Sequence, residues 1–108
     1  MKSERSFKHV GFITRREDQS FAQFIEHWEE VHSRLVLKLP KLRGYVLNPI
    51  DREQYPDSPV DGFSELWFDS LEDAKEAFNS PAGKEIVKDT SKFTNDVIFT
   101  YLTENRRM

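Results

Sequence analysis

Three segments that are predicted to be β-strands carry apolar side chains on both faces. In residues 62–68, Phe63 and Trp67 share one face, and Leu66 and Phe68 share the other. An antiparallel sheet with one face in water alternates apolar and polar residues along each strand. Both faces of this sheet are therefore expected to be covered, by helices of the same chain or by another surface.

The predicted elements follow one another in the order βαββαβ, with one short additional helix. Ser20 and Gln23 form a capping box at the start of the first helix, and Pro40 ends that helix. Ser80 followed by Pro81 starts the short additional helix. The predicted strands are residues 8–15, 42–48, 62–68 and 96–103, the predicted helices are 20–39, 71–79 and 81–88, and a loop or broken turn is expected over 89–95.

This order of elements is typical of the ferredoxin-like arrangement. It predicts an α+β fold in which a four-stranded antiparallel sheet carries its helices on one face. The 108 residues suit a single domain, 1–108, with a core of about 8–102. The simplest cover for the other face of the sheet is the same face of a second copy, which gives a two-fold homodimer. A fixed partner protein and a bare ligand-binding sheet are the alternatives.

His32 lies within the apolar stripe of the predicted helix 20–39. At about 100° per residue it falls about 40° from Trp28, which lies in the middle of the stripe. A group that titrates near neutral pH is therefore expected to point into the protein. It can act there as a general acid or base on a carbonyl compound, or be a hydrogen-bonded core residue. The other stripe residues are Phe21, Phe24, Ile25, Val31, Leu35 and Leu39.

Glu65 is a second candidate catalytic residue, in the middle of an apolar strand. Burial of a carboxylate is costly unless it is paired. It can orient His32 or exchange a proton with a substrate. Alternatively, it can form a salt bridge to Arg43 or Lys8, or be partly solvated at the rim of the sheet.

Tyr45 is the third candidate, because its hydroxyl can polarise a substrate carbonyl and Gly44 before it allows a close approach. The alternative is a core tyrosine with a satisfied hydroxyl. Asn48, at the end of the same strand, is a candidate ligand-binding residue or a turn residue. The aromatic candidates for a pocket lining, which are equally typical of a plain core, are Phe12, Trp28, Trp67, Phe93 and Phe99.

The sequence favours no metal site and no cofactor. His27 and His32 are five residues apart, about 140° around a helix, whereas zinc helices pair histidines four residues apart. His27 is therefore expected near the solvent edge. The chain has no cysteine for thiolate ligands, and its four glycines form no phosphate-binding motif.

The net charge of -3 and the mixed signs along the chain favour no nucleic-acid partner. No apolar run is long enough for a membrane span, and the N-terminus shows no signal segment, so a cytoplasmic protein is expected.

An ordered set of segments covers nearly the whole chain from about residue 8 to residue 102. It consists of Phe24-x-x-His-Trp-x-x-x-His32, Leu42-Arg-Gly-Tyr45, Asp61-Gly-Phe-Ser-Glu-Leu-Trp-Phe-Asp69 with Ser70, and then Asp89 with Phe93. This set resembles the EthD domain of the dimeric α/β-barrel superfamily. The resemblance implies a dimer whose two sheets face each other as a barrel, with a small-molecule pocket between helix and sheet in each subunit.

The resemblance also implies a range of activities. Relatives include muconolactone-type isomerases, polyketide cyclases and dehydratases, and cofactor-free monooxygenases. Several use a histidine on the first helix, which corresponds to His32. Others use a histidine after the second helix, where this chain has Asn79-Ser-Pro-Ala-Gly83, which disfavours cyclase chemistry of that type. Some relatives bind haem through one histidine, but the crowded stripe around His32 and the lack of a basic cluster disfavour haem here.

The expected function is therefore cofactor-free acid–base chemistry on an aromatic or cyclic carbonyl compound in a catabolic or secondary-metabolic pathway. Isomerisation, dehydration and cyclisation are the reaction types that fit. A non-catalytic binding protein for a small hydrophobic compound and a cofactor-independent monooxygenase are the alternatives.

Overall fold

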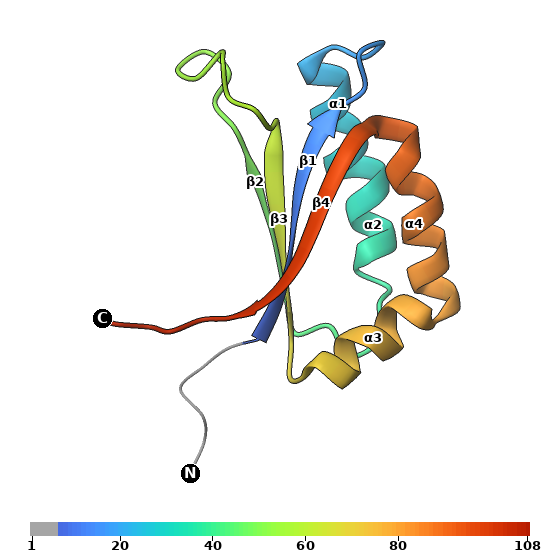
Figure 1. The fold of residues 1–108 in the computed structure, drawn as a ribbon. Coiled ribbons are helices and arrows are strands. Elements are labelled where there is room, and N and C mark those ends of the chain that lie inside the picture. The colour runs from blue at the N-terminus through green and yellow to red at the C-terminus, as the bar shows by residue number, and fades with distance from the viewer. Residues whose placement is uncertain (1–6) are drawn as a thin grey trace.

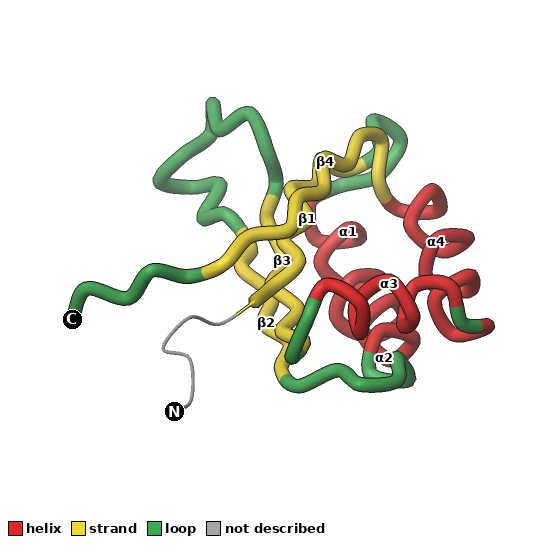
Figure 2. The backbone as a smooth tube through the Cα atoms, turned by 60° about the horizontal axis from the view of Figure 1, so that its bottom comes forward, coloured by secondary structure: helices red, strands yellow, loops and turns green. Residues whose placement is uncertain are grey.

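The structure, a computed structural model, describes residues 7–108. They fold into a four-stranded antiparallel sheet in the order β2-β3-β1-β4, with the helices on one face (Figures 1 and 2). This ferredoxin-like architecture confirms the predicted fold class. The strands are β1 (Phe7–Arg15), β2 (Gly44–Pro49), β3 (Gly62–Phe68) and β4 (Thr94–Thr103), and the helical segments are α1 (Phe21–His27), η1 (Trp28–His32), α2 (Ser33–Val36), α3 (Leu71–Asn79) and α4 (Pro81–Phe93).

The segments α1, η1 and α2 form one continuous helix, and its middle turn, η1, is π-helical. Ser20 and Gln23 cap its start through the predicted reciprocal hydrogen bonds. The regular helix ends at Val36 rather than at the predicted Leu39. After Val36 the chain forms a tighter turn, in which the amides of residues 38 and 39 donate hydrogen bonds to carbonyls three residues earlier instead of four.

The last helix, α4, is longer than predicted. It continues through residues 89–93, where a loop or broken turn was expected, and β4 begins directly after it. Two side chains in this extra turn are buried, Asp89 and Phe93. Their burial against the first helix stabilises the helical conformation of residues 89–93, which no local sequence signal predicts.

Strand register divides the sheet residues between two faces. On the helix-covered face, one row across β2, β3, β1 and β4 is Tyr45, Leu66, His9 and Tyr101, and the next is Leu47, Ser64, Gly11 and Phe99. On the open face, one row is Val46, Glu65, Val10 and Thr100, and the next is Asn48, Phe63, Phe12 and Ile98. Phe99 and Ile98 thus lie on opposite faces.

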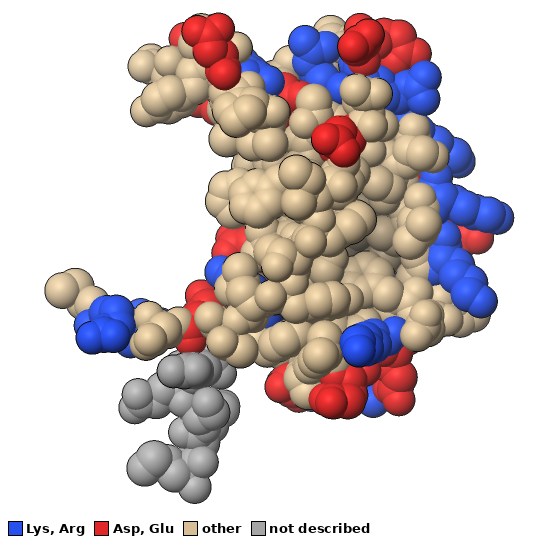
Figure 3. Space-filling model, viewed as in Figure 1, with Lys and Arg blue, Asp and Glu red and all other residues tan. Residues whose placement is uncertain are grey.

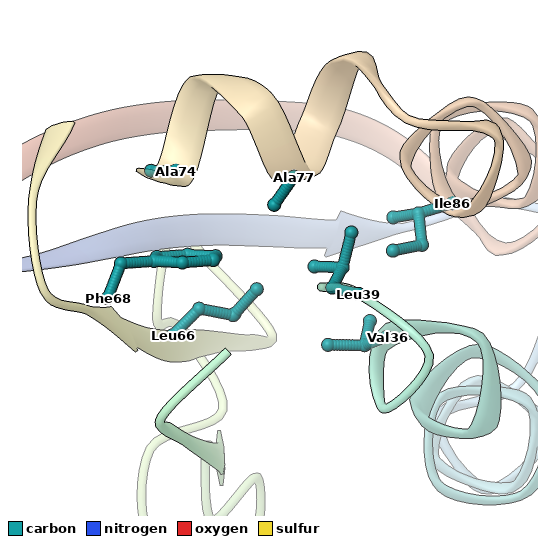
Figure 4. Packing of buried hydrophobic residues seen from close by; sticks show 7 residues of the cluster. All are labelled: Val36, Leu39, Leu66, Phe68, Ala74, Ala77 and Ile86. Carbon is teal, nitrogen blue, oxygen red and sulfur yellow. The ribbon is translucent and has the colours of Figure 1, made fainter. Parts of the chain in front are cut away.

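The core consists of two clusters of buried apolar side chains between sheet and helices. In the first cluster, α3 turns Ala74 and Ala77 toward Phe68 and Leu66 of β3 (Figure 4). The second consists of Ile13, Phe24, Trp28 and Phe93. Gly62 permits this packing, since a Cβ atom there would lie 2.8 Å from the Trp28 ring.

The open face of the sheet confirms that apolar residues occur on both faces. Ile98 is 60% exposed, and Val46, Phe12 and Leu102 are also exposed. No helix of residues 7–108 packs on this face (Figure 1). None of the helices in that described part is long and apolar enough to cross a membrane.

Candidate functional site

A cavity of about 370 Å³ lies between the sheet and the helices. Its mouth opens between β4 and α4, where Phe99 and Val87 line it and are themselves exposed, and the surface is visibly hollowed there (Figure 3). The lining is mainly apolar and aromatic and draws on both core clusters. The polar or titratable residues that line it are His9, His32, Tyr45, Ser64, Thr90 and Tyr101.

The two central strands, β3 and β1, form the middle of the cavity floor. Gly11 and Ser64, two small residues, lie opposite each other in the register of these strands. A Cβ atom on residue 11 would lie 3.3 Å from both the Phe99 ring and the Ser64 hydroxyl. Glycine at this position therefore lets the Phe99 ring pack close to the floor of the cavity.

His32 lines this cavity, as the helical periodicity predicts. It is only 8% exposed, and its Nδ1 lies 2.9 Å from a carboxylate oxygen of Asp89. Burial lowers the pKa of His32, and the hydrogen bond with Asp89 opposes this shift. Because a carboxylate only accepts hydrogen bonds, Nδ1 carries the proton, and Nε2 of the neutral ring keeps a lone pair.

Asp89 also binds His27, whose Nε2 lies 2.9 and 3.0 Å from its two oxygens. The prediction that His27 and His32 lie on different helix faces is therefore wrong. In the π-helical turn the Ser33 amide bonds to the Trp28 carbonyl five residues earlier, so residues five apart lie on one side of the helix. Burial raises the pKa of Asp89, but the hydrogen bonds from the two histidines outweigh it and lower the pKa overall.

Asp89 is the residue that sequence reasoning missed, since the segment 89–95 was expected to be a loop or broken turn. A usable signal exists, because Ile86, Asp89 and Phe93 follow helical spacing and place Asp89 on the buried side of a longer α4. The carboxylate that orients His32 is thus Asp89 and not Glu65.

Of the other predicted site residues, four lie in the cavity with His32. They are Trp28, Tyr45, Phe93 and Phe99. The Tyr45 hydroxyl is buried and makes no well-formed hydrogen bond within residues 7–108. Burial raises the pKa of Tyr45, and an interaction with Trp28 opposes the shift only in part.

The remaining predicted site residues lie on the open face. Glu65 accepts hydrogen bonds there from the Lys8 ammonium at 2.6 Å and from the Asn48 amide at 3.1 Å. The same ammonium lies 5.2 Å from the centre of the Trp67 ring. Phe12 is on this face as well. The sheet separates all four from His32, and for Glu65 the salt bridge to Lys8 is the interpretation that the contacts support.

His9 is a cavity residue that the sequence analysis did not select. It is only 6% exposed, packs against the rings of Phe78, Phe99 and Tyr101, and leaves its Nδ1 without a hydrogen-bond partner in residues 7–108. Burial lowers the pKa of His9 to about 4. The alternation along β1, in which residues 9, 11 and 13 share a face, was the available signal.

Burial of His9 predicts a fold that loses stability in mild acid. The unfolded chain takes up a proton below about pH 6.5, whereas folded His9 does so only near pH 4. Above pH 6.5 the folded state bears no such penalty. Between these values the free energy of unfolding falls by up to about 3 kcal/mol, and His32 shifts it in the same direction. Urea unfolding at pH 7, 5.5 and 4.5, at one protein concentration, measures this slope. His9→Leu should flatten it, and an unchanged slope in that variant contradicts the assignment.

Among residues 7–108, no group of three or more histidine or carboxylate side chains is arranged to hold a metal ion. The lining of the cavity includes no lysine or arginine. The site therefore offers imidazole and hydroxyl groups in an apolar setting, which suits proton transfer and hydrogen bonding to a small molecule.

Comparison with known proteins places this geometry in a family. The EthD domain model matches residues 16–96. An uncharacterised 11.0 kDa protein in the thcB–thcC intergenic region of Rhodococcus erythropolis is 25% identical over 83 residues, which cover 77% of this chain and 81% of that protein. The crystal structure of an EthD family protein from Bacillus halodurans C-125 has a TM-score of 0.75 and 25% identity, and the match covers 94% of this chain and 98% of that one.

A hydroxynitrile lyase from Passiflora edulis has the same fold, with a TM-score of 0.76, 16% identity and coverage of 95% of this chain and 96% of that one. Since the EthD model spans most of the sequence and the predicted ferredoxin-like fold is present, the chain belongs to the EthD domain family.

Proposed function

We propose that this protein binds an aromatic or cyclic carbonyl compound in the cavity and catalyses proton transfer on it without a cofactor. The observation that carries the proposal is the hydrogen bond from His32 Nδ1 to Asp89, which leaves Nε2 of a cavity-lining imidazole as a base. The cavity of about 370 Å³ is at the lower end of the range of small-molecule sites, so it suits a compound of one or two rings.

His32 is the proposed base. Its Nε2 removes a proton from the carbon next to the carbonyl, and the electron pair of that C–H bond becomes an enolate. The negative charge of Asp89 stabilises the imidazolium that forms. Where the enolate is conjugated with a further double bond, returning the proton to the far carbon of that system gives an isomer. Where the next carbon bears a hydroxyl, the enolate instead expels it as hydroxide, which takes the proton from the His32 imidazolium and leaves as water, and the product is dehydrated.

Tyr45 is the proposed partner of the carbonyl oxygen. Its raised pKa keeps the hydroxyl protonated at neutral pH, so it can donate a hydrogen bond. That bond strengthens as negative charge develops on the oxygen, and it therefore favours the enolate over the ketone.

We further propose a homodimer in which the open faces of two sheets cover each other. The exposed apolar residues of this face, Ile98 and Val46 among them, support it. Ferredoxin-like proteins of Bacteroides fragilis and Thermobifida fusca with the same fold are dimeric. The Lys8–Glu65 ion pair is then enclosed with its charges already matched.

The test uses 2-tetralone, a bicyclic ketone with exchangeable protons beside the carbonyl. Dissolved in D₂O with the protein, it should exchange these protons at least about tenfold faster than with free imidazole at the same concentration, because the base is oriented beside the ketone. Proton NMR follows the loss of signal. A ketone that binds but does not exchange faster contradicts the catalytic proposal and supports the non-catalytic binding protein.

A further inference from the structure

Two buried polar atoms of cavity-lining residues make no well-formed hydrogen bond within residues 7–108. They are Nδ1 of His9 and the hydroxyl of Tyr45. A buried polar group without a partner costs about 1–3 kcal/mol. Two such groups in one cavity therefore indicate that a ligand completes the site.

The two groups lie at opposite ends of the cavity floor. Tyr45 on β2, Leu66 on β3 and His9 on β1 form one row across the sheet. Neighbouring strands are about 4.8 Å apart, so the Cα atoms of the outer two are about 10 Å apart. Between them and one row further on lie two small residues of the cavity lining, Gly11 and Ser64. One ligand of two fused rings can span this floor.

The charge of the site fixes the charge of the ligand. No lysine or arginine lines the cavity, so a carboxylate ligand would lose its water without gaining a cation. His9 is itself neutral at pH 7, because burial lowers its pKa to about 4. A cationic ligand would have to reach Asp89, whose oxygens already bind His27 and His32.

The chemistry of each end fixes the ligand group that suits it. A neutral imidazole offers one donor and one acceptor, and a hydroxyl pairs with it in either tautomer. The protonated Tyr45 hydroxyl lacks an acceptor, which a carbonyl oxygen supplies.

We infer that the cavity selects an uncharged fused-ring compound with a hydroxyl at the His9 end and a carbonyl at the Tyr45 end. This inference rests on the proposed function and narrows its substrate class. His9 then acts as a binding residue, separate from the base His32.

Four probes test the inference. Naphthalene carries neither group, 2-naphthol carries the hydroxyl, 2-acetonaphthone carries the carbonyl, and 6-hydroxy-2-acetonaphthone carries both. Dissociation constants from amide chemical shifts should fall by about tenfold for each added group. His9→Leu should abolish the gain in affinity that the hydroxyl gives and leave the gain from the carbonyl unchanged. Tyr45→Phe should abolish the gain in affinity that the carbonyl gives and leave the gain from the hydroxyl unchanged. His9→Gln, which keeps a donor and an acceptor, should retain part of the hydroxyl gain.

The outcomes separate this inference from the proposal on which it rests. If all four probes bind equally, or if the gains persist in both variants, the inference is wrong while the apolar ligand site stands. If none of the probes binds, the ligand site itself is wrong. Thermal unfolding and circular dichroism show whether each variant is folded. If His9→Leu is not folded, His9→Gln decides: a reduced hydroxyl gain supports the inference, and an undiminished gain contradicts it.

Discussion

Replacement of His32 by glutamine should lower the rate of 2-tetralone proton exchange by roughly 10²–10⁴-fold and change the affinity for the ketone by less than about tenfold. Glutamine is close in size and can still donate a hydrogen bond to Asp89, so the cavity wall is preserved. It has no nitrogen lone pair that accepts a proton at neutral pH. Exchange by proton NMR and binding by amide chemical shifts measure the two effects separately.

Two carboxylate variants extend this test: one lies in the site, and the other serves as a control on the open face. Asp89→Asn should also slow exchange, by roughly 10²-fold or more, since the amide can stabilise the wrong tautomer of His32. Glu65→Gln, on the open face, should exchange at the wild-type rate. Activity that survives intact in His32→Gln removes this histidine from the mechanism.

Introduction of a charge on the open face, by Ile98→Glu, should convert the dimer to monomers. At a two-fold interface the substitution enters twice, and each carboxylate is buried without a partner. The dissociation constant should rise by roughly a thousandfold or more. Light scattering after size exclusion, at micromolar concentration, should give about twice the 12.8 kDa chain mass for the wild type and the chain mass for the variant.

Leu37→Glu is the matched control, because Leu37 is similarly exposed but lies beyond the first helix and away from the open face. It should leave the dimer intact. A wild-type protein that is monomeric at these concentrations contradicts the proposed assembly, whatever the variants show.

Local signals predicted much of the fold. Both β3 and α3 have the predicted bounds, since a glycine starts the strand and Ser70 caps the helix. The serine caps at residues 20 and 80 are present as predicted. The end of α4 was missed because its last turn is held by burial of Asp89 and Phe93 against another helix, which is a non-local effect.

The candidate site was predicted only in part, for two physical reasons. Helical periodicity aimed His32 inward, but regular 100° spacing does not describe a π-helical turn, so the shared contact of His27 and His32 with Asp89 was missed. Alternation divides each strand into two faces but does not say which face the helices cover. The face of each residue follows only from the register between the strands in the folded sheet. This register puts Glu65 on the open face and His9 on the face that lines the cavity.

A crystal structure of the protein with 2-tetralone bound shows whether the ketone lies where His32 can take its proton. We expect the ketone in the cavity whose mouth opens between α4 and β4, with the carbon next to its carbonyl within about 3.5 Å of His32 Nε2, the reach of a proton transfer. Its oxygen should accept a hydrogen bond from the Tyr45 hydroxyl. A ketone bound on the open face of the sheet, or in the cavity with the carbonyl turned away from His32, would contradict the proposed proton transfer.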